Sequence, residues 1–193
     1  IHHIAWERGS FHWRDEINNG KLSGPTIYTC GAILYGPVKD PEGLVQEQKN
    51  KGFDFIKIYS FVSQDEFHKA IQKAKRAGIY TAGHIPFSVG LDGVLSEGMD
   101  GIAHIEELDF EFISFDDSKK LDRIGLLRNI IDAAIQQHKM LIGLDIEGLE
   151  EKFGKTISAT IDKLRTANIP ICTTLVVGEG IVKKLHKTEA FLK

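Results

Sequence analysis

The stretch GFDFIKIYSFVSQDEFHKAIQKAKRAGIYTAGH, residues 52–84, decides the fold class. It opens with β-branched and aromatic residues, which predict a strand over residues 52–59. Ser63 and Glu66 then have the spacing of a capping box, and apolar side chains recur at helical spacing until Gly78. Residues 79–84 are apolar again, so the whole stretch predicts one strand–helix–strand unit.

The same alternation of strands and helices continues on both sides of this unit. Further strands are predicted over residues 25–31, 100–105 and 169–177, and further helices over residues 13–18, 91–97 and 155–167. Residues 109–150 are longer and predict a helical insertion, with an apolar helix face over residues 121–138. Strands that alternate with helices pair in parallel, through right-handed crossovers.

The chain therefore predicts an α/β fold with about five parallel strands, in a single domain over residues 1–193. The strands are short and apolar on both faces, as in parallel sheets that helices cover on both sides. A closed (β/α)8 barrel needs eight strands and about 250 residues. Two architectures are therefore open, namely a doubly wound sheet or part of such a barrel.

Composition excludes several classes of protein. Lys and Arg total 24 and Asp and Glu total 27, so the net charge of −3 argues against a basic nucleic-acid binder or a polybasic membrane anchor. No apolar run approaches the roughly 20 residues of a membrane helix. Cys30 and Cys172 do not make a disulfide scaffold, and no signal peptide is visible, so we expect a cytoplasmic protein.

Three polar side chains occur where buried strands should be apolar. Lys57, His84 and His104 each stand at or near the carboxyl end of a predicted strand, one strand–helix unit apart. In an α/β barrel these strand ends converge on the face that carries the chemistry. We therefore expect a lysine and two histidines to lie side by side.

This trio is compatible with more than one chemistry. Two neutral imidazoles on neighbouring strands suit a divalent metal such as Zn, Ni, Co, Mn or Fe. A buried Lys57 with a lowered pKa is a nucleophile, which either reacts with CO₂ to form a metal-bridging carbamate or attacks a carbonyl substrate. The non-functional alternatives are that the two histidines are structural residues held by hydrogen bonds, and that the ammonium group of Lys57 reaches solvent at the end of the sheet.

Other polar residues carry weaker signals. Glu106 and Glu107 directly follow His104, and we expect both on the surface, because paired carboxylates after a strand end usually face solvent. His12, His68, His138 and His186 lie on helical stretches and are also expected on the surface. The sequence contains no dinucleotide fingerprint, phosphate-binding loop or serine-hydrolase elbow.

Five motifs, taken together, resemble those of a known family. They are GPTIYTCG (24–31), FDFIKIYS (53–60), AGHIP (82–86), GIAHIE (101–106) and TTLVV (173–177). The order lysine, histidine, histidine on three consecutive strands resembles the amidohydrolase superfamily. The most similar subgroup contains imidazolonepropionase-like enzymes and Xaa-Pro dipeptidases.

The resemblance implies a (β/α)8 barrel with one or two divalent metal ions, most often zinc. By matching motifs, Lys57 would be the bridging lysine, carboxylated in its active form, and His84 and His104 would be metal ligands. A metal-activated hydroxide would then hydrolyse the C–N bond of an amide, a cyclic amide or a dipeptide. The substrate would be a small amide or peptide.

The sequence also departs from the family pattern. It contains no H-x-H pair for the first strand, and no equivalent is found for the aspartate at the end of the eighth strand, which acts as ligand and general acid/base. Asp145 lies in the predicted insertion and is not that residue. We therefore expect the chain to hold strands three to seven of a longer parent, and to have little or no hydrolase activity alone.

Two alternatives come from other functional classes. One is a lyase or aldolase in which Lys57 forms a Schiff base, which leaves the paired histidines unexplained. The other is a non-catalytic α/β scaffold. Because unpaired sheet edges invite further pairing, we also expect self-association or association with the missing parent segments.

Overall fold

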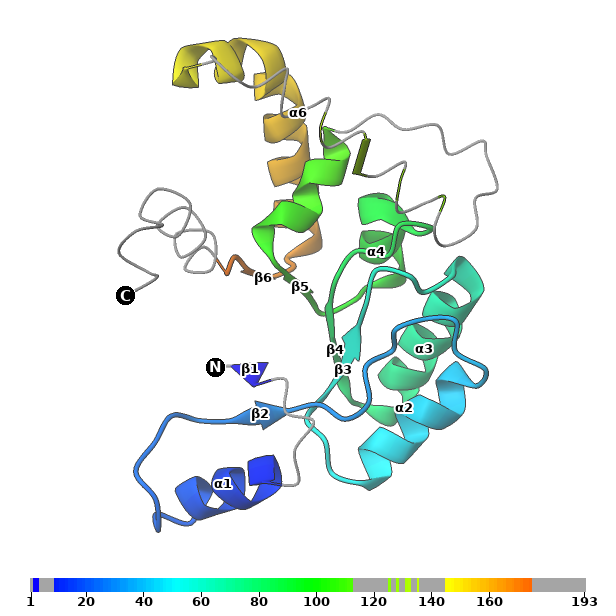
Figure 1. The fold of residues 1–193 in the computed structure, drawn as a ribbon, viewed down its shortest axis with the longest axis vertical. Coiled ribbons are helices and arrows are strands. Elements are labelled where there is room, and N and C mark those ends of the chain that lie inside the picture. The colour runs from blue at the N-terminus through cyan, green and yellow to red at the C-terminus, as the bar shows by residue number, and fades with distance from the viewer. Residues whose placement is uncertain are drawn as a thin grey trace.

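The computed structural model describes residues 2–3, 9–112 and 145–174, together with residues 125, 128, 131, 132 and 135. Strands and helices alternate along the chain (Figure 1). The strands are β1 (His2–His3), β2 (Tyr28–Thr29), β3 (Phe55–Ile58), β4 (Tyr80–Gly83), β5 (Gly101–Ala103) and β6 (Ile171–Cys172). The helices are α1 (Gly9–Asn18), α2 (Pro41–Asn50), α3 (Gln64–Ala77), α4 (Gly90–Glu97), the 3₁₀ helix η1 (Ile105–Glu111) and α6 (Ile146–Ala167).

The central sheet is parallel and has the order β3-β4-β5-β6. Strand β2 pairs in parallel with β1, and an isolated bridge from Cys30 to Phe55 connects this pair to β3. Each of the five strands predicted from the sequence is present in shortened form, and every pairing is parallel. The predicted α/β class is therefore confirmed, with a four-stranded parallel sheet at its centre.

Helix α3 forms where local signals and burial agree. The Ser63 side chain accepts from the backbone N–H of Glu66, the Glu66 carboxylate accepts from the backbone N–H of Ser63, and Gly78 ends the helix with a φ of 60°. The predicted capping box and stop are thus both present. Phe67, Ala70, Ile71 and Ala74 form the buried face that packs on the sheet.

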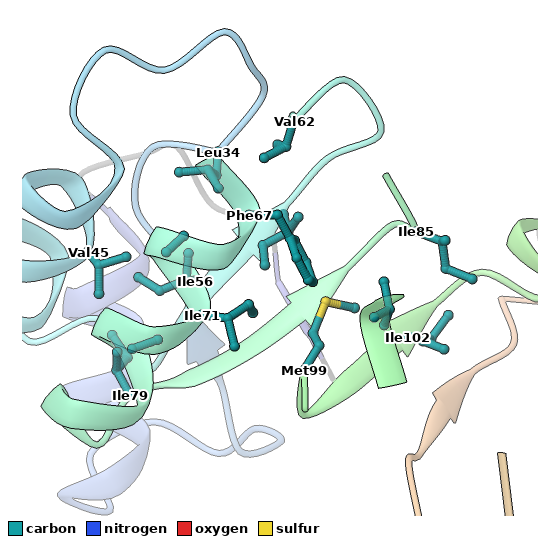
Figure 2. Close-up of a cluster of buried hydrophobic side chains, with 14 of the residues drawn as sticks. Leu34, Val45, Ile56, Val62, Phe67, Ile71, Ile79, Ile85, Met99 and Ile102 are labelled. Carbon is teal, nitrogen blue, oxygen red and sulfur yellow. The ribbon is translucent and has the colours of Figure 1, made fainter. Parts of the chain in front are cut away.

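The hydrophobic core lies between the sheet and the helices α2, α3 and α4 (Figure 2). Side chains alternate along β3, so that Ile56 and Ile58 enter this core while Phe55 and Lys57 line an open cavity of about 230 Å³ on the opposite face. The two faces of the sheet therefore differ in what covers them. One is packed by helices, and the other carries the polar side chain of Lys57.

Several element boundaries differ from the sequence predictions. Helix α2 is not predicted, although Asp40 caps it by accepting from the backbone N–H of Gly43 and Pro41 occupies its first turn. Helix α6 begins at Ile146 rather than at residue 155, because the Asp145 side chain caps it through Gly148. Parts of two predictions lie outside the described residues. They are most of the predicted helix over residues 121–138, within the predicted insertion, and the end of the last predicted strand, residues 175–177.

None of the described helices is both long and apolar enough to cross a membrane. The expected cytoplasmic location and self-association stay predictions.

Gly83 offers a test of how closely β4 approaches β3. Its φ is 154°, and a Cβ placed there would lie 2.0 Å from the backbone oxygen of Ile58. We expect Gly83→Ala to lower the free energy of unfolding by several kcal/mol, since overpacking alone costs about 1–3 kcal/mol and the backbone cost adds to it. Urea unfolding measures this change.

Gly52→Ala is the matched control for that substitution. Gly52 also has a positive φ, of 79°, but nothing lies within 4 Å of its added Cβ. This variant should lose only the backbone term, about 1–2 kcal/mol. Equal losses in the two variants would contradict the close approach of β4 to Ile58.

Glu66 predicts a pH dependence of stability. Burial raises its pKa, but hydrogen bonds from the backbone N–H groups of Ser63 and Val38 outweigh this, and the net pKa lies below the ordinary value. A lowered folded-state pKa stabilises the protein above the unfolded pKa, and this stabilisation is lost as the pH falls through the folded pKa.

We therefore expect Glu66→Gln to lower the free energy of unfolding by about 1.5–3 kcal/mol at neutral pH, as for the loss of a hydrogen bond to a charged group. The difference from the wild type should shrink below about pH 4.3, the ordinary pKa of glutamate. Unfolding curves at neutral and acid pH measure it, with Asp65→Asn in the same helical turn as the control. A difference that does not change with pH would rule out this role of Glu66.

Candidate functional site

The three predicted site residues lie at one edge of the parallel sheet. Lys57 is the third residue of β3 and pairs in register with Ala82 of β4, two residues before His84. His84 directly follows β4, and His104 directly follows β5. The imidazole rings of His84 and His104 meet edge to face, with centroids 4.9 Å apart. The structure thus brings the two histidines together beside Lys57, as the sequence predicts.

The backbone of His104 departs from regular strand geometry. Ile102 enters the core and Ala103 lines the cavity, so strict alternation would direct the next side chain back toward the helices. His104 instead has a φ of 75°, which is rare for a residue with a Cβ. This turn of the backbone accompanies the contact between its ring and that of His84. Sparsely populated backbone conformations of this kind cluster at functional sites.

The His84 ring contacts Glu107, Ser60 and Tyr59. Its Nδ1 lies 2.5 Å from Glu107 Oε1 and 3.0 Å from Ser60 Oγ. The Tyr59 ring packs against the imidazole with centroids 4.2 Å apart. These contacts leave Nε2 as the ring nitrogen with no hydrogen bond among the described residues.

His104 is anchored in a similar way. Its Nδ1 lies 3.0 Å from Thr174 Oγ1, in the segment after β6. Burial, followed by the positive charges of Lys57 and His84, lowers the pKa of His104 below the ordinary value. A lowered pKa favours the neutral ring, which is the form that binds metals.

Lys57 is buried, with only 4% of the residue exposed. Burial lowers the pKa of its ammonium group, while the charges of Cys30 and Glu107 oppose that shift. Desolvation disfavours a charged amine, so the neutral and nucleophilic form becomes more accessible. Lys57 is therefore buried, as expected, and its reactivity stays a prediction.

Glu107 corrects a prediction made from the sequence. It was expected on the surface with Glu106, but only 6% of Glu107 is exposed, whereas the side chain of Glu106 is 63% exposed. Glu107 lies in the 3₁₀ helix η1 with its carboxylate close to His84, and this carboxylate accepts a hydrogen bond from the backbone N–H of Ile85. The spacing of three residues after His104 is the one sequence signal for this placement.

The donor set fits part of a divalent metal site. Imidazole nitrogen is a common ligand of zinc and related metals, and metal-binding histidines usually have the other ring nitrogen hydrogen-bonded to an oxygen, as here. Within the described residues, however, no group of three or more His, Cys, Asp or Glu side chains could hold a metal ion. The described side chains therefore supply two imidazoles and Lys57, and not a complete coordination shell.

No protein-family model matches the chain, and no curated protein matches it. Solved structures do match. Bottromycin amidohydrolase is 21% identical over 68% of this chain and 31% of its own, with a TM-score of 0.51.

Two further structures match less closely. A structure described as a putative prolidase from Bifidobacterium longum is 20% identical, over 54% of this chain and 32% of its own, with a TM-score of 0.45. A Xaa-Pro dipeptidase with bound methionine is 19% identical, over 89% of this chain and 53% of its own, also with a TM-score of 0.45. The chain thus spans about a third to a half of the length of these proteins.

The likeness to bottromycin amidohydrolase concerns the fold. The described part of the chain has the fold of part of an amidohydrolase, which confirms at the level of fold the resemblance seen in the sequence motifs. Identity at this level carries no residue roles with it. The roles of Lys57, His84 and His104 therefore rest on their own geometry.

The strain at His104 can be measured by comparing two substitutions. Both His104→Gly and His104→Ala remove the imidazole, but only glycine adopts a φ of 75° without steric cost. We expect the glycine variant to be more stable than the alanine variant by about 1–2 kcal/mol. Urea unfolding of the two variants measures the difference. Equal stability, or a more stable alanine variant, would show that the backbone at residue 104 is unstrained.

Proposed function

We propose that this chain carries part of the active site of a metal-dependent amidohydrolase with a (β/α)8 barrel, which hydrolyses an amide or dipeptide C–N bond. The observation that carries the proposal is the pair of imidazoles, 4.9 Å apart, at the carboxyl edge of a parallel sheet beside a buried lysine. Catalytic groups of α/β barrels occur at this edge. The amidohydrolase fold of the described residues supports the same conclusion.

In this proposal His84 and His104 hold a divalent cation, most simply zinc, and Lys57 holds it as a carbamate. A bound cation would polarise the substrate carbonyl and lower the pKa of a bound water. Glu107, Ser60 and Thr174 orient the two rings through their Nδ1 atoms. Burial of Lys57 favours the neutral amine, the form that reacts with CO₂.

Metal binding is the first test of this function. Purified chain should bind at least one equivalent of zinc or cobalt, measured as metal content per chain and by titration. His84→Ala and His104→Ala should each abolish this binding, since each removes one of the two imidazole ligands. Intact mass of the same sample should show CO₂ bound at Lys57, and Lys57→Ala should lose it.

His68→Ala is the matched control. His68 lies on α3 and its side chain is 57% exposed, pairing with Glu97 on the outer surface. This variant should bind metal as the wild type does. Metal binding that survives both His84→Ala and His104→Ala, or no binding by the wild type, would count against the proposed metal site.

A second candidate function follows from Lys57 alone. Its burial and lowered pKa also suit an amine that attacks a ketone or aldehyde to form a Schiff base. Borohydride reduction would then trap a carbonyl compound on Lys57 without any metal. This alternative gives no role to the paired histidines, so the metal-dependent hydrolase is the stronger proposal.

A further inference from the structure

Two tyrosine rings form a row with the candidate site at the carboxyl edge of the sheet. Tyr35 lies between β2 and α2, and Tyr59 directly follows β3. Their rings are stacked, with centroids 4.9 Å apart and an angle of 22° between the ring planes. The Tyr59 ring also lies 4.2 Å from the ring of His84, which follows β4. The row of rings therefore continues from the histidines across the ends of the neighbouring strands.

The two tyrosines lie on the same side of the sheet as Lys57. Lys57 lines the open cavity and Ile58 enters the core, so alternation along the strand directs Tyr59 to the cavity side. Leu34 forms a parallel bridge with Ile58 and belongs to the same core, so Tyr35 is directed to the cavity side as well. The stacking of the two rings agrees with this placement.

The backbone on both sides of Tyr35 is fixed, although 44% of this residue is exposed. Leu34 is fully buried, and its N–H and carbonyl are hydrogen-bonded to the backbone of residues 57–59, at 2.8 Å and 3.0 Å. Gly36 has a φ of 75°, and a Cβ placed there would collide with the backbone oxygen of Phe61. A ring that is already held in place loses little conformational freedom when a ligand binds to it.

Further aromatic rings extend this surface. The ring of Phe61 lies 5.6 Å from that of Tyr35, the ring of Phe87 lies 5.5 Å from that of Phe61, and the ring of Phe110 lies 5.1 Å from that of Phe87. All three phenylalanines are partly buried. Aromatic rings bind other flat apolar groups through offset-stacked or edge-to-face contacts. The chemistry of this surface therefore favours an apolar, and above all an aromatic, ligand group.

We infer that the rings of Tyr35 and Tyr59 form a subsite for a flat apolar group of the substrate, such as a phenyl ring. That the substrate is an amide rests on the proposed function, whereas the affinity of the two rings for an aromatic group does not. Because the Tyr59 ring contacts that of His84, a group stacked on the tyrosines lies next to the candidate metal site. The substrate class is then an amide or dipeptide with an aromatic side chain.

The four tyrosines of the chain make this subsite measurable. Tyr28 and Tyr80 are the first residues of β2 and β4, at the amino edge of the sheet, and are 49% and 41% exposed. In carbon-13 NMR of labelled tyrosine rings, N-acetylphenylalanine amide added to the metal-free chain should shift the signals of Tyr35 and Tyr59 and leave the other two unchanged. Substitution of each tyrosine by phenylalanine assigns the signals. Shifts at Tyr28 and Tyr80 instead would overturn the inference.

The dissociation constants of two probes test the chemistry of the subsite. N-acetylphenylalanine amide should bind at least about 10-fold more tightly than N-acetylalanine amide, the lower end of the effect of apolar contacts in enzyme pockets. Tyr35→Ala and Tyr59→Ala should each remove most of this preference, and Tyr59→Phe should keep it. Tyr28→Ala is the matched control, since it removes a similarly exposed ring from the amino edge. Equal affinity for both probes, or a preference that survives both site variants, would contradict the subsite.

Tyr59→Leu covers the case in which Tyr59→Ala does not fold, as judged by circular dichroism. Leucine keeps an apolar side chain beside His84 but offers no flat face for stacking. The preference for the phenylalanine probe should therefore fall in this variant too. A full wild-type preference in a folded Tyr59→Leu chain would reject the role of the Tyr59 ring.

Binding measured without metal separates this inference from the proposed function. A chain that binds no zinc but prefers the phenylalanine probe at Tyr35 and Tyr59 would support the subsite and reject the metal site. A chain that binds zinc through His84 and His104 but does not distinguish the two probes would reject the subsite and support the metal site.

Discussion

The parallel register of β3, β4 and β5 is the constraint on which the site depends. Lys57 pairs with Ala82, and Ala82 pairs with Gly101, so three positions form one row across the sheet. The residues that follow this row then emerge at the same edge. β4 presents Gly83 directly against the backbone of Ile58 in β3, and the rings of Tyr59 and His84, which follow these two strands, pack with centroids 4.2 Å apart. A shift of one residue would send these side chains to opposite faces.

Several features that destabilise a folded protein occur together at this edge of the sheet. Lys57 and Glu107 are buried ionisable groups, and His104 has an uncommon backbone conformation. In α3, by contrast, local preference and packing agree, and no buried side-chain nitrogen or oxygen of the described residues lacks a hydrogen-bond partner. Proteins depart from such consistency mainly at functional sites. The departures thus mark the same place that the paired histidines do.

Local signals explain which features could be predicted from the sequence. The capping box at Ser63 and the stop at Gly78 involve neighbouring residues, so the bounds of α3 follow from the sequence. The spacing of Lys57, His84 and His104, one strand–helix unit from each to the next, follows from the strand–helix repeat. Glu107 could not be placed in this way, because its partner His84 is in another unit and only the turn of η1 brings them together. Helix α2 is different, because its local signals, the cap Asp40 and Pro41 in its first turn, are present in the sequence. It could therefore have been predicted without knowledge of any tertiary contact.

The supports of the two rings come from successive strand–helix units. Ser60, after β3, and Glu107, after β5, both contact the ring of His84, which follows β4. Thr174, after β6, contacts the ring of His104, which follows β5. Each imidazole is therefore oriented by the units beside its own, and neither is positioned by its own loop alone. Because sheet pairing fixes the neighbours of each strand, the orientation of the rings depends on the same parallel order that brings them together.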